Sequence, residues 1–373
     1  MVLYLWRYVP TDNYLEEEPY YKCEMAIADA HSLVWCERYQ TPGEFVLKIK
    51  ATPELLQFFA NNETLITRQD TKRAMIPETI ELKTSAKLGD YLTISGRSVE
   101  SILTRRAITQ TYTLEGDVCL IIDNLIKENA GNYWYYNSDS EHSEKLEKLK
   151  FINLLERYGQ YKCGVLTKAQ PIGQNLGTFV YDLCAAAGIG FGIDWVDGKF
   201  KYYPYRGANR SIHQTQRTPV IFSEEFGNLG ETVFSITKQT AYTRIVVGGE
   251  GEGKNRKFGV ANKSDRYGGM LLREKFIDSS KVSSNSSGVS SDSYIALLDS
   301  IAKSELDASA ETVNLDAEAL PGGQYEYRKD YNLGDTVTVR NSYGITGDVI
   351  VTEVVESMDS SGLKVVPKFT EWR

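Results

Sequence analysis

The sequence predicts an α+β protein that is predominantly β, with a similar antiparallel β-module at each end of the chain. Two observations lead to this prediction. The sequence Leu-Gly-Asp-Tyr-Leu-Thr-Ile at 88–94 returns as Leu-Gly-Asp-Thr-Val-Thr-Val at 333–339. The clear amphipathic helices lie between these two copies, so the middle of the chain differs from both ends.

The repeated Gly-Asp pair predicts a turn that begins a strand. Glycine supplies the turn backbone at no steric cost, and aspartate can hydrogen-bond its own turn. We therefore predict Gly89, Asp90, Gly334 and Asp335 as structural turn residues. After each pair, threonines alternate with apolar residues, as the two-residue period of a half-buried strand requires. Because a Gly-Asp pair before a strand is common, the surrounding strands are needed to support a duplication.

Short alternating runs around both copies predict those strands. The predicted strands are 44–49, 63–68, 76–83, 92–96, 335–340, 348–355 and 362–366, with a short helix at 52–60. Each strand is bounded by Gly, Asp, Asn or Ser. This pattern is typical of a meander in a small antiparallel barrel or sandwich.

The middle unit, about 105–210, is predicted to be α+β. Asp117 can cap a helix with one apolar stripe that ends near Gly131, and Asn175 can cap a second helix closed by Gly188. Cys184 lies on the inner face of this second helix and is predicted to fill the core. The Asp-Gly pair at 197–198 then predicts a tight hairpin over 191–203.

The β pattern restarts at 219–223, 231–237 and 244–247, before a second interruption over about 250–325. This interruption contains a glycine-rich turn and a serine-rich stretch at 279–293, which predicts a mobile loop. One helix closes it before Pro321. Its predicted inward residues are Tyr294, Leu297, Leu298 and Ile301.

The bulk composition excludes several function classes. At 373 residues the chain should form two to four units, and its 24 tyrosines suit half-buried strands and subunit interfaces. The net charge of −8 argues against a nucleic-acid reader, although it suits a surface along which DNA slides. We expect neither a signal peptide nor a membrane span, because no apolar run is long enough.

The sequence patterns that could indicate a metal, phosphate or catalytic site are weak. The five cysteines are scattered, odd in number and without CxxC spacing, so we expect neither a disulfide framework nor a zinc site. His31, His142 and His213 lie far apart in the sequence. The loop 248–255 nearly spells a phosphate-binding loop, but Glu250 and Glu252 would oppose phosphate and no helix follows. We predict a flexible turn there, no cofactor, no metal and no catalytic constellation.

Two other functions stay open at this point. A cell-wall glycan hydrolase would use two carboxylates, whose separation in space the sequence does not give. A carbohydrate-binding protein would use an aromatic surface, for which residues 133–136 (Tyr-Trp-Tyr-Tyr) are candidates. Core or interface packing is the favoured use of these aromatic residues.

A series of motifs covers most of the chain from about residue 40. The motifs are Pro-Gly-Glu-Phe at 42–45, Leu-Thr-Ile-Ser-Gly-Arg-Ser at 92–98 with Leu103 and Arg105-Arg106, Val-Ile-Phe-Ser at 220–223, Gly-Asn-Leu at 227–229, Val-Val-Gly-Gly-Glu-Gly at 246–251 with Arg256, Arg-Glu at 273–274, Asp-Tyr-Asn-Leu-Gly-Asp at 330–335 and Val-Thr-Glu-Val-Val-Glu at 351–356. Taken in this order, the motifs resemble those of the tail-hub or tail-associated proteins of siphophages and prophages of Gram-positive bacteria.

The resemblance implies a baseplate-hub fold, with two similar antiparallel β-barrel domains and two smaller inserted domains. The implied domains are a first barrel at 1–104, an inserted α+β domain at 105–210, a second barrel at 211–249 and 326–373, and an insertion at 250–325. Three chains would place six barrels in a ring that matches a sixfold tail tube and presents threefold symmetry below.

The implied function is structural, in the virion tail tip, without catalytic residues. A homotrimer would cap the tail tube protein and contact the distal tail protein ring and the tape measure protein. DNA would pass through the lumen without specific binding. Because the chain stops at Trp372-Arg373, we expect receptor-binding or wall-degrading roles to belong to other tip subunits. The sequence does not separate a siphophage hub from that of a contractile tail or a tail-like bacteriocin.

Overall fold

The computed structural model describes residues 1–10, 20–86, 89–108, 113–130, 155–157, 159, 161–171, 173–239, 241–263, 268–280, 291–309 and 312–370. The chain divides into two compact units. Unit 1 comprises Met1–Glu231 and Ala317–Thr370, and unit 2 is built from Thr232–Asp316. Most of the predicted serine-rich loop lies outside the described residues. Among the described residues, no helix is both long and apolar enough to cross a membrane.

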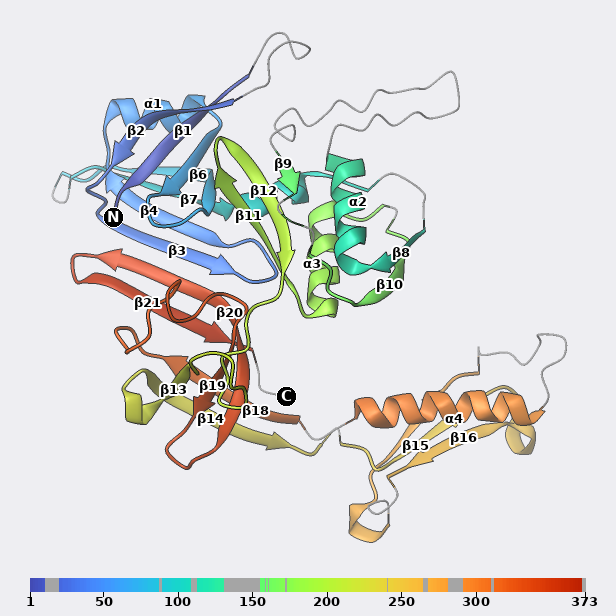
Figure 1. Ribbon diagram of the computed structural model, residues 1–373. Helices are drawn as coiled ribbons and strands as arrows, with labels where there is room; N and C mark the ends of the chain where they lie inside the picture. Colours follow the sequence, from blue (N-terminus) through green and yellow to red (C-terminus); the bar gives the residue numbers. More distant parts are fainter. Residues whose placement is uncertain are drawn as a thin grey trace, which may run out of the picture. The chain divides into compact units, whose positions relative to one another are not determined.

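Unit 1 contains an eleven-stranded sheet made from both ends of the chain (Figure 1). Its strand order is β13-β19-β20-β3-β4-β7-β6-β5-β1-β2, and β21 pairs with β20. The strands are β1 Leu3–Val9, β2 Tyr20–Ile27, β3 Ser32–Arg38, β4 Glu44–Lys50, β5 Thr64–Arg68, β6 Ala74–Lys83, β7 Tyr91–Ser98, β13 Ile221–Ser223, β19 Thr336–Arg340, β20 Thr346–Asp359 and β21 Gly362–Phe369. The strands predicted around both Gly-Asp pairs are confirmed.

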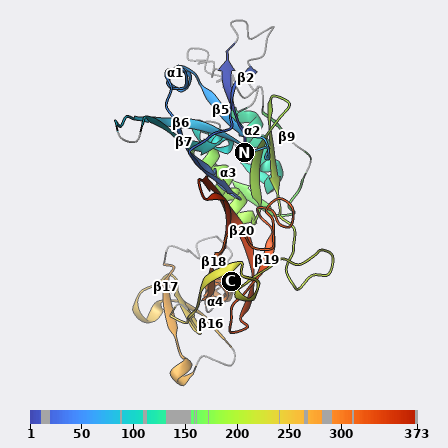
Figure 2. The same ribbon diagram turned by 90° about the vertical axis from the view of Figure 1, so that its left-hand side faces the viewer.

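The long strand β20 joins the two ends of the chain. Its first part pairs with β19 (Thr336 opposite Ile350), and its second part pairs with β3 (Cys36 opposite Val355). Figure 2 shows β20 from the side. Among the described residues the path of paired strands is open, with β13 and β2 at its ends, so no closed barrel is present there. The resemblance did not anticipate one shared sheet.

The apolar side chains of the first strands form one core. In the β4–β7 pair, Leu47 lies opposite Ile94 and Ile49 opposite Leu92, and all four are buried. Phe58 and Phe59 of α1 (Pro53–Asn61) pack into the same core. Full burial of each large apolar side chain contributes roughly 1.5–3 kcal/mol. The predicted short helix is confirmed, and the Thr52 hydroxyl caps it by accepting from the Leu55 amide.

The middle of unit 1 carries the predicted helices. The elements are η1 Val99–Arg105, β8 Leu114–Asp117, α2 Val118–Ala130, β9 Leu155–Arg157, β10 Leu166–Ala169, α3 Leu176–Ala187, β11 Gly190–Val196 and β12 Lys199–Tyr205. Asn175 caps α3 by accepting from the Thr178 amide, and Gly188 ends it in the left-handed conformation. Cys184 is fully buried in the helical core. These three predictions are confirmed.

The Asp-Gly hairpin is also confirmed. Asp197 and Gly198 both have positive φ, +56° and +75°, and they connect the antiparallel strands β11 and β12. Two consecutive residues with positive φ are what the hairpin turn favoured by strand twist requires.

Unit 2 is a small α/β layer in which α4 (Ser291–Ala308) lies against the sheet of β16, β15 and β17 (Figure 1). The strands are β15 Arg244–Gly248, β16 Phe258–Asn262 and β17 Glu274–Asp278, and the chain enters and leaves the unit through β14 Leu229–Thr237 and β18 Thr312–Ala319. Ile245 and Val247 pack against Tyr294 and Leu298. The predicted inward position of Leu297 is wrong, because its side chain is 45% exposed.

Candidate functional site

The first Gly-Asp turn lies between β6 and β7 and is exposed. Gly89 has φ of +81°, a region that favours glycine. The Asp90 carboxylate accepts the Ser85 amide at 3.1 Å, and its backbone carbonyl accepts the Ala51 amide at 2.9 Å. A Cβ added to Gly89 would meet no atom within 4 Å. The Asp90 carboxylate therefore bonds within its own turn, whereas the Asp90 carbonyl bonds to the residue that follows β4.

The second Gly-Asp turn precedes β19 and is buried. Gly334 has φ of +88°, and Asp335 is only 2% exposed. The Asp335 carboxylate accepts hydrogen bonds from the Ala208 amide at 2.6 Å, the Asn332 amide at 2.9 Å and Arg210 Nε at 2.9 Å. The carboxylate thus fixes the segment that leads into β13 to the start of β19.

Gly334 also lies in a tight contact between three segments. A Cβ added there would come within 2.2 Å of the Tyr39 ring, which follows β3. A Cβ on Gly207 would come within 2.0 Å of the Gly334 carbonyl carbon. Only residues without a side chain allow this approach of the three segments.

Both turns occupy the same place in a strand ladder. The backbone carbonyl of Asp90 accepts the Ala51 amide at the end of β4, and that of Asp335 accepts the Val351 amide of β20 at 3.0 Å. The strands that follow, β7 and β19, then pair antiparallel with β4 and β20.

Four charged side chains in unit 1 form an ion cluster, termed the buried ion cluster: Glu37, Arg68 and Glu356 are buried, and Arg328 is half-buried. Arg68 donates to Glu356 at 2.7 and 3.1 Å and to Asp70 at 2.9 Å. Arg328 bridges Glu37 and Glu356, each at 2.8 Å. Because Glu37 is on β3 and Glu356 on β20, the cluster links a strand near the start of the chain to a strand near its end, across their pairing.

The charged groups of this cluster have hydrogen-bond partners, as buried charge requires. Glu37 also accepts from Trp35 Nε1 at 3.1 Å and from the Tyr327 hydroxyl at 2.9 Å. Burial opposes ionisation of Glu37, but the charges of Arg328 and Arg73 and these hydrogen bonds hold its pKa below the ordinary value. The carboxylate is therefore ionised at neutral pH.

An open, polar cavity of about 770 Å³ lies beside this cluster. Its lining residues are Glu37, Gln69, Asp70, Thr71, Lys72, Arg73, Asp194, Tyr203, Tyr205, Tyr327, Arg328, Asn332 and Leu333. Salt bridges to Arg68 and Arg328 help to lower the pKa of Asp70, although burial opposes this. A glycosidase needs one carboxyl with a raised pKa as general acid. The lowered pKa values of Glu37 and Asp70 do not supply one.

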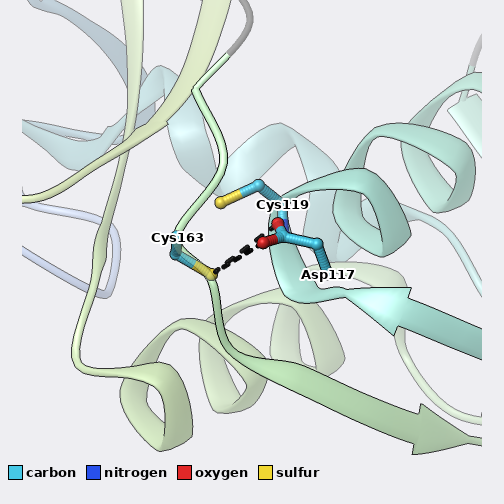
Figure 3. Close-up of side chains that lie close together, drawn as sticks. All are labelled: Asp117, Cys119 and Cys163. Atoms are coloured by element: carbon cyan, nitrogen blue, oxygen red, sulfur yellow. Dashed lines mark hydrogen bonds between the residues drawn. The ribbon is translucent and has the colours of Figure 1, made fainter.

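A separate cluster in the middle of unit 1, the thiol–carboxylate cluster, consists of Asp117, Cys119 and Cys163 (Figure 3). Its ligand atoms all lie within 4.8 Å of one another. The Cys163 sulfur is 3.7 and 3.9 Å from the two Asp117 oxygens. Asp117 ends β8, Cys119 lies in the first turn of α2, and Cys163 precedes β10.

Backbone amides hold the carboxylate of this cluster. Burial opposes ionisation of Asp117, but hydrogen bonds from the amides of Gly164 at 2.7 Å and Cys119 at 2.9 Å keep its pKa below the ordinary value. Burial raises the pKa of the Cys119 thiol to about 12. Sequence spacing did not reveal this cluster, because Asp117 and Cys163 are 46 residues apart. The Asp-x-Cys step at a helix start was the one local signal.

The remaining candidates that lie in the described part of the chain do not converge on a site. The His31 ring lies 5.0 Å from the Tyr91 ring, whereas His213 Nε2 lies 3.9 Å from an oxygen of Asp348. His142 and the aromatic residues 133–136 lie outside the described residues. The loop predicted as a turn forms one short 3-10 turn at Gly253–Asn255 and enters β16, without the helix that a phosphate site needs.

Comparison with known proteins relates the chain to phage tails. Residues 18–369 match the family model described as Siphovirus ReqiPepy6 Gp37-like protein. The tail protein from Neisseria meningitidis MC58 is similar with a TM-score of 0.53 at 13% identity, over 99% of this chain and 95% of that one. The 43 kDa tail protein of prophage MuSo2 from Shewanella oneidensis is similar with a TM-score of 0.53 at 10% identity, over 99% and 98%. No curated protein matches the chain.

At these identities the two solved structures show a shared fold, and the family match covers nearly the whole chain. The resemblance to siphophage and prophage tail proteins is thereby confirmed at the level of family and of a mostly β fold. The chain belongs to the Siphovirus ReqiPepy6 Gp37-like protein family.

Proposed function

We propose that this chain is the structural hub of a siphophage or prophage tail tip, in which three copies form a ring of six similar β-modules. The observation that carries the proposal is the shared ladder position of the two Gly-Asp turns. In each, a glycine with φ near +85° is followed by an aspartate whose carbonyl accepts an amide from the antiparallel partner strand. Two look-alike modules in one chain allow three chains to match a sixfold tube.

The modules of the proposal are 1–104 and 211–249 with 326–373, and residues 105–210 and 250–325 are inserted domains. Within unit 1, the pairing of β20 with β3 and the buried ion cluster hold the strands of the two modules in one sheet. A fixed angle between modules supports ring closure, because six modules close a ring only at one angle.

The hub would cap the tail tube protein and contact the distal tail protein ring, the tape measure protein and other tip subunits. DNA would cross the lumen without specific binding, which the net charge of −8 supports because like charge prevents a polyanion from sticking. The role is non-catalytic. The lowered pKa values of Glu37 and Asp70 in the polar cavity support that view.

Native mass spectrometry and electron-microscopy class averages test the proposal. We expect the purified chain, alone or with its neighbouring tail subunits, to give a trimer of three times 42.0 kDa, about 126 kDa, with six lobes in top view. A chain that stays monomeric at every concentration and joins no ring would overturn the proposal. A trimer whose electron-microscopy class averages show three lobes of unrelated shape would also overturn the proposal.

A glycan-release assay on purified cell walls separates the hub from the hydrolase alternative. We expect no release by the wild-type protein above a heat-denatured sample. Release that is lost in the Asp70→Asn variant would instead identify an enzyme that uses the polar cavity.

A further inference from the structure

We propose that the thiol–carboxylate cluster of Asp117, Cys119 and Cys163 binds one thiophilic divalent cation, with Zn²⁺ as the best match. Two sulfurs and one carboxylate are donors that zinc accepts in tetrahedral sites. They come from three places in the chain, the end of β8, the first turn of α2 and the segment before β10. The inference concerns the middle of unit 1 and does not depend on the hub function.

The distances fit a tetrahedral ion. With Zn–S of about 2.3 Å and Zn–O of about 2.0 Å, ideal angles place a sulfur and an oxygen about 3.5 Å apart and two sulfurs about 3.8 Å apart. The Cys163 sulfur lies 3.7 and 3.9 Å from the Asp117 oxygens, and all three donors are within 4.8 Å of one another. Small side-chain movements would therefore place all three donors around one ion (Figure 3).

The surrounding backbone already orients these donors. The amides of Cys119 and Gly164 donate to separate oxygens of Asp117, which fixes the plane of the carboxylate. Gly164 has φ of +74°, and this left-handed turn brings Cys163 back toward the start of α2. Outer hydrogen bonds of this kind orient the ligands of natural metal sites.

Charge also favours a cation here. Among the residues that the structure describes, no Lys or Arg forms an ion pair with Asp117. Two thiolates and a carboxylate would bring three negative charges together, which a divalent ion largely neutralises. Cys163 is half-buried, which leaves an entry path, whereas Asp117 and Cys119 are buried.

Cobalt titration of the fully reduced protein tests the site. We expect one equivalent of Co²⁺ to give a thiolate-to-cobalt charge-transfer band with the visible bands of tetrahedral cobalt, and Zn²⁺ to remove both. Zn²⁺ should also raise the Tm of the full-length chain, because an ion that binds only the folded state stabilises it.

Two variants and one control locate the ion. Cys163→Ser should weaken binding by at least about 100-fold, which exceeds the effect of losing an outer-sphere partner, and should abolish the Tm rise. Asp117→Asn keeps a helix-capping side chain but removes the charge, and should weaken binding by at least about 10-fold. Cys23→Ser removes an exposed thiol outside the cluster and should bind like the wild type. Circular dichroism confirms that each variant is folded.

Three outcomes would overturn the proposal. The first is the absence of a charge-transfer band in the reduced wild-type protein. The second is equal metal affinity in the wild type and in folded Cys163→Ser. The third is a Cys119–Cys163 disulfide whose reduction restores no metal uptake, which would identify a redox pair instead.

Discussion

The two Gly-Asp turns have nearly the same backbone and very different surroundings. Gly89 and Gly334 have φ of +81° and +88°, and a strand with buried apolar residues follows each. Asp90 is exposed, whereas Asp335 is buried and accepts three hydrogen bonds, two from the segment of Ala208 and Arg210 and one from Asn332 of its own turn. A short sequence can therefore set the backbone of a turn, whereas the packing around the turn decides how much the free energy of unfolding depends on that turn.

Removing the Asp335 carboxylate should have the largest effect. Asp335→Ala leaves the Ala208 and Asn332 amides and the Arg210 guanidinium without their acceptor. Breaking a buried pair on one side destabilises by about 3–5 kcal/mol. Urea unfolding of the purified chain measures this change. A loss under about 1 kcal/mol would mean that water reaches the site and that the second turn resembles the first.

Adding one methyl group to each glycine compares the turns directly. Gly334→Ala places a Cβ within 2.2 Å of the Tyr39 ring and adds backbone strain, which together should destabilise by roughly 2–4 kcal/mol. Gly89→Ala meets open space, so only the strain of its positive φ remains, about 1 kcal/mol. Both values come from the same unfolding experiment. Equal effects of the two substitutions would remove the proposed contrast.

The buried ion cluster provides a pH-dependent test. It is connected to the second Gly-Asp turn through Glu356, which lies on β20, the strand paired with β19. Glu37→Gln removes the charge that faces Arg328 and should destabilise by roughly 1.5–3 kcal/mol at pH 7. The folded pKa of Glu37 is lowered, so its contribution is complete above the unfolded value of about 4.3 and is lost as pH falls through the folded value.

The difference between wild type and Glu37→Gln should therefore shrink in acid. Glu326→Gln, which breaks an exposed pair with Lys329, serves as the control and should leave the free energy of unfolding unchanged within the error of the measurement. If the difference in the free energy of unfolding between the wild type and Glu37→Gln is constant from pH 7 to pH 3, the assignment of an ionised, paired Glu37 is contradicted.

Local features could be predicted from the sequence because their causes are local. The Asn175 cap bonds an amide three residues later, and the Asp197-Gly198 turn needs only two positive φ angles. The strands on both sides of each Gly-Asp pair followed from a two-residue period. Leu297 was wrongly predicted to face the core. Its helix α4 packs on a small sheet, which covers a narrower stripe of the helix surface than the apolar pattern suggested.

Features that join distant segments could not be predicted. Arg68 and Glu356 are 288 residues apart, and nothing near either residue indicates the partner. The same holds for the β20–β3 pairing and for Cys163, whose spacing from Asp117 matches no known motif. Even for Asp335, the sequence indicated the turn but gave no sign of Arg210, because only the folded chain brings that segment to the start of β19.

The smallest effect is expected at Asp90. Asp90→Ala removes the carboxylate that accepts the Ser85 amide at 3.1 Å on an exposed turn, where water can take its place. The backbone carbonyl that accepts the Ala51 amide is untouched, so the ladder that the two turns share survives the substitution. Stability should change by no more than about 0.5 kcal/mol. If Asp90→Ala instead destabilises as much as Asp335→Ala, the aspartate itself holds both turns, and burial is not what separates them.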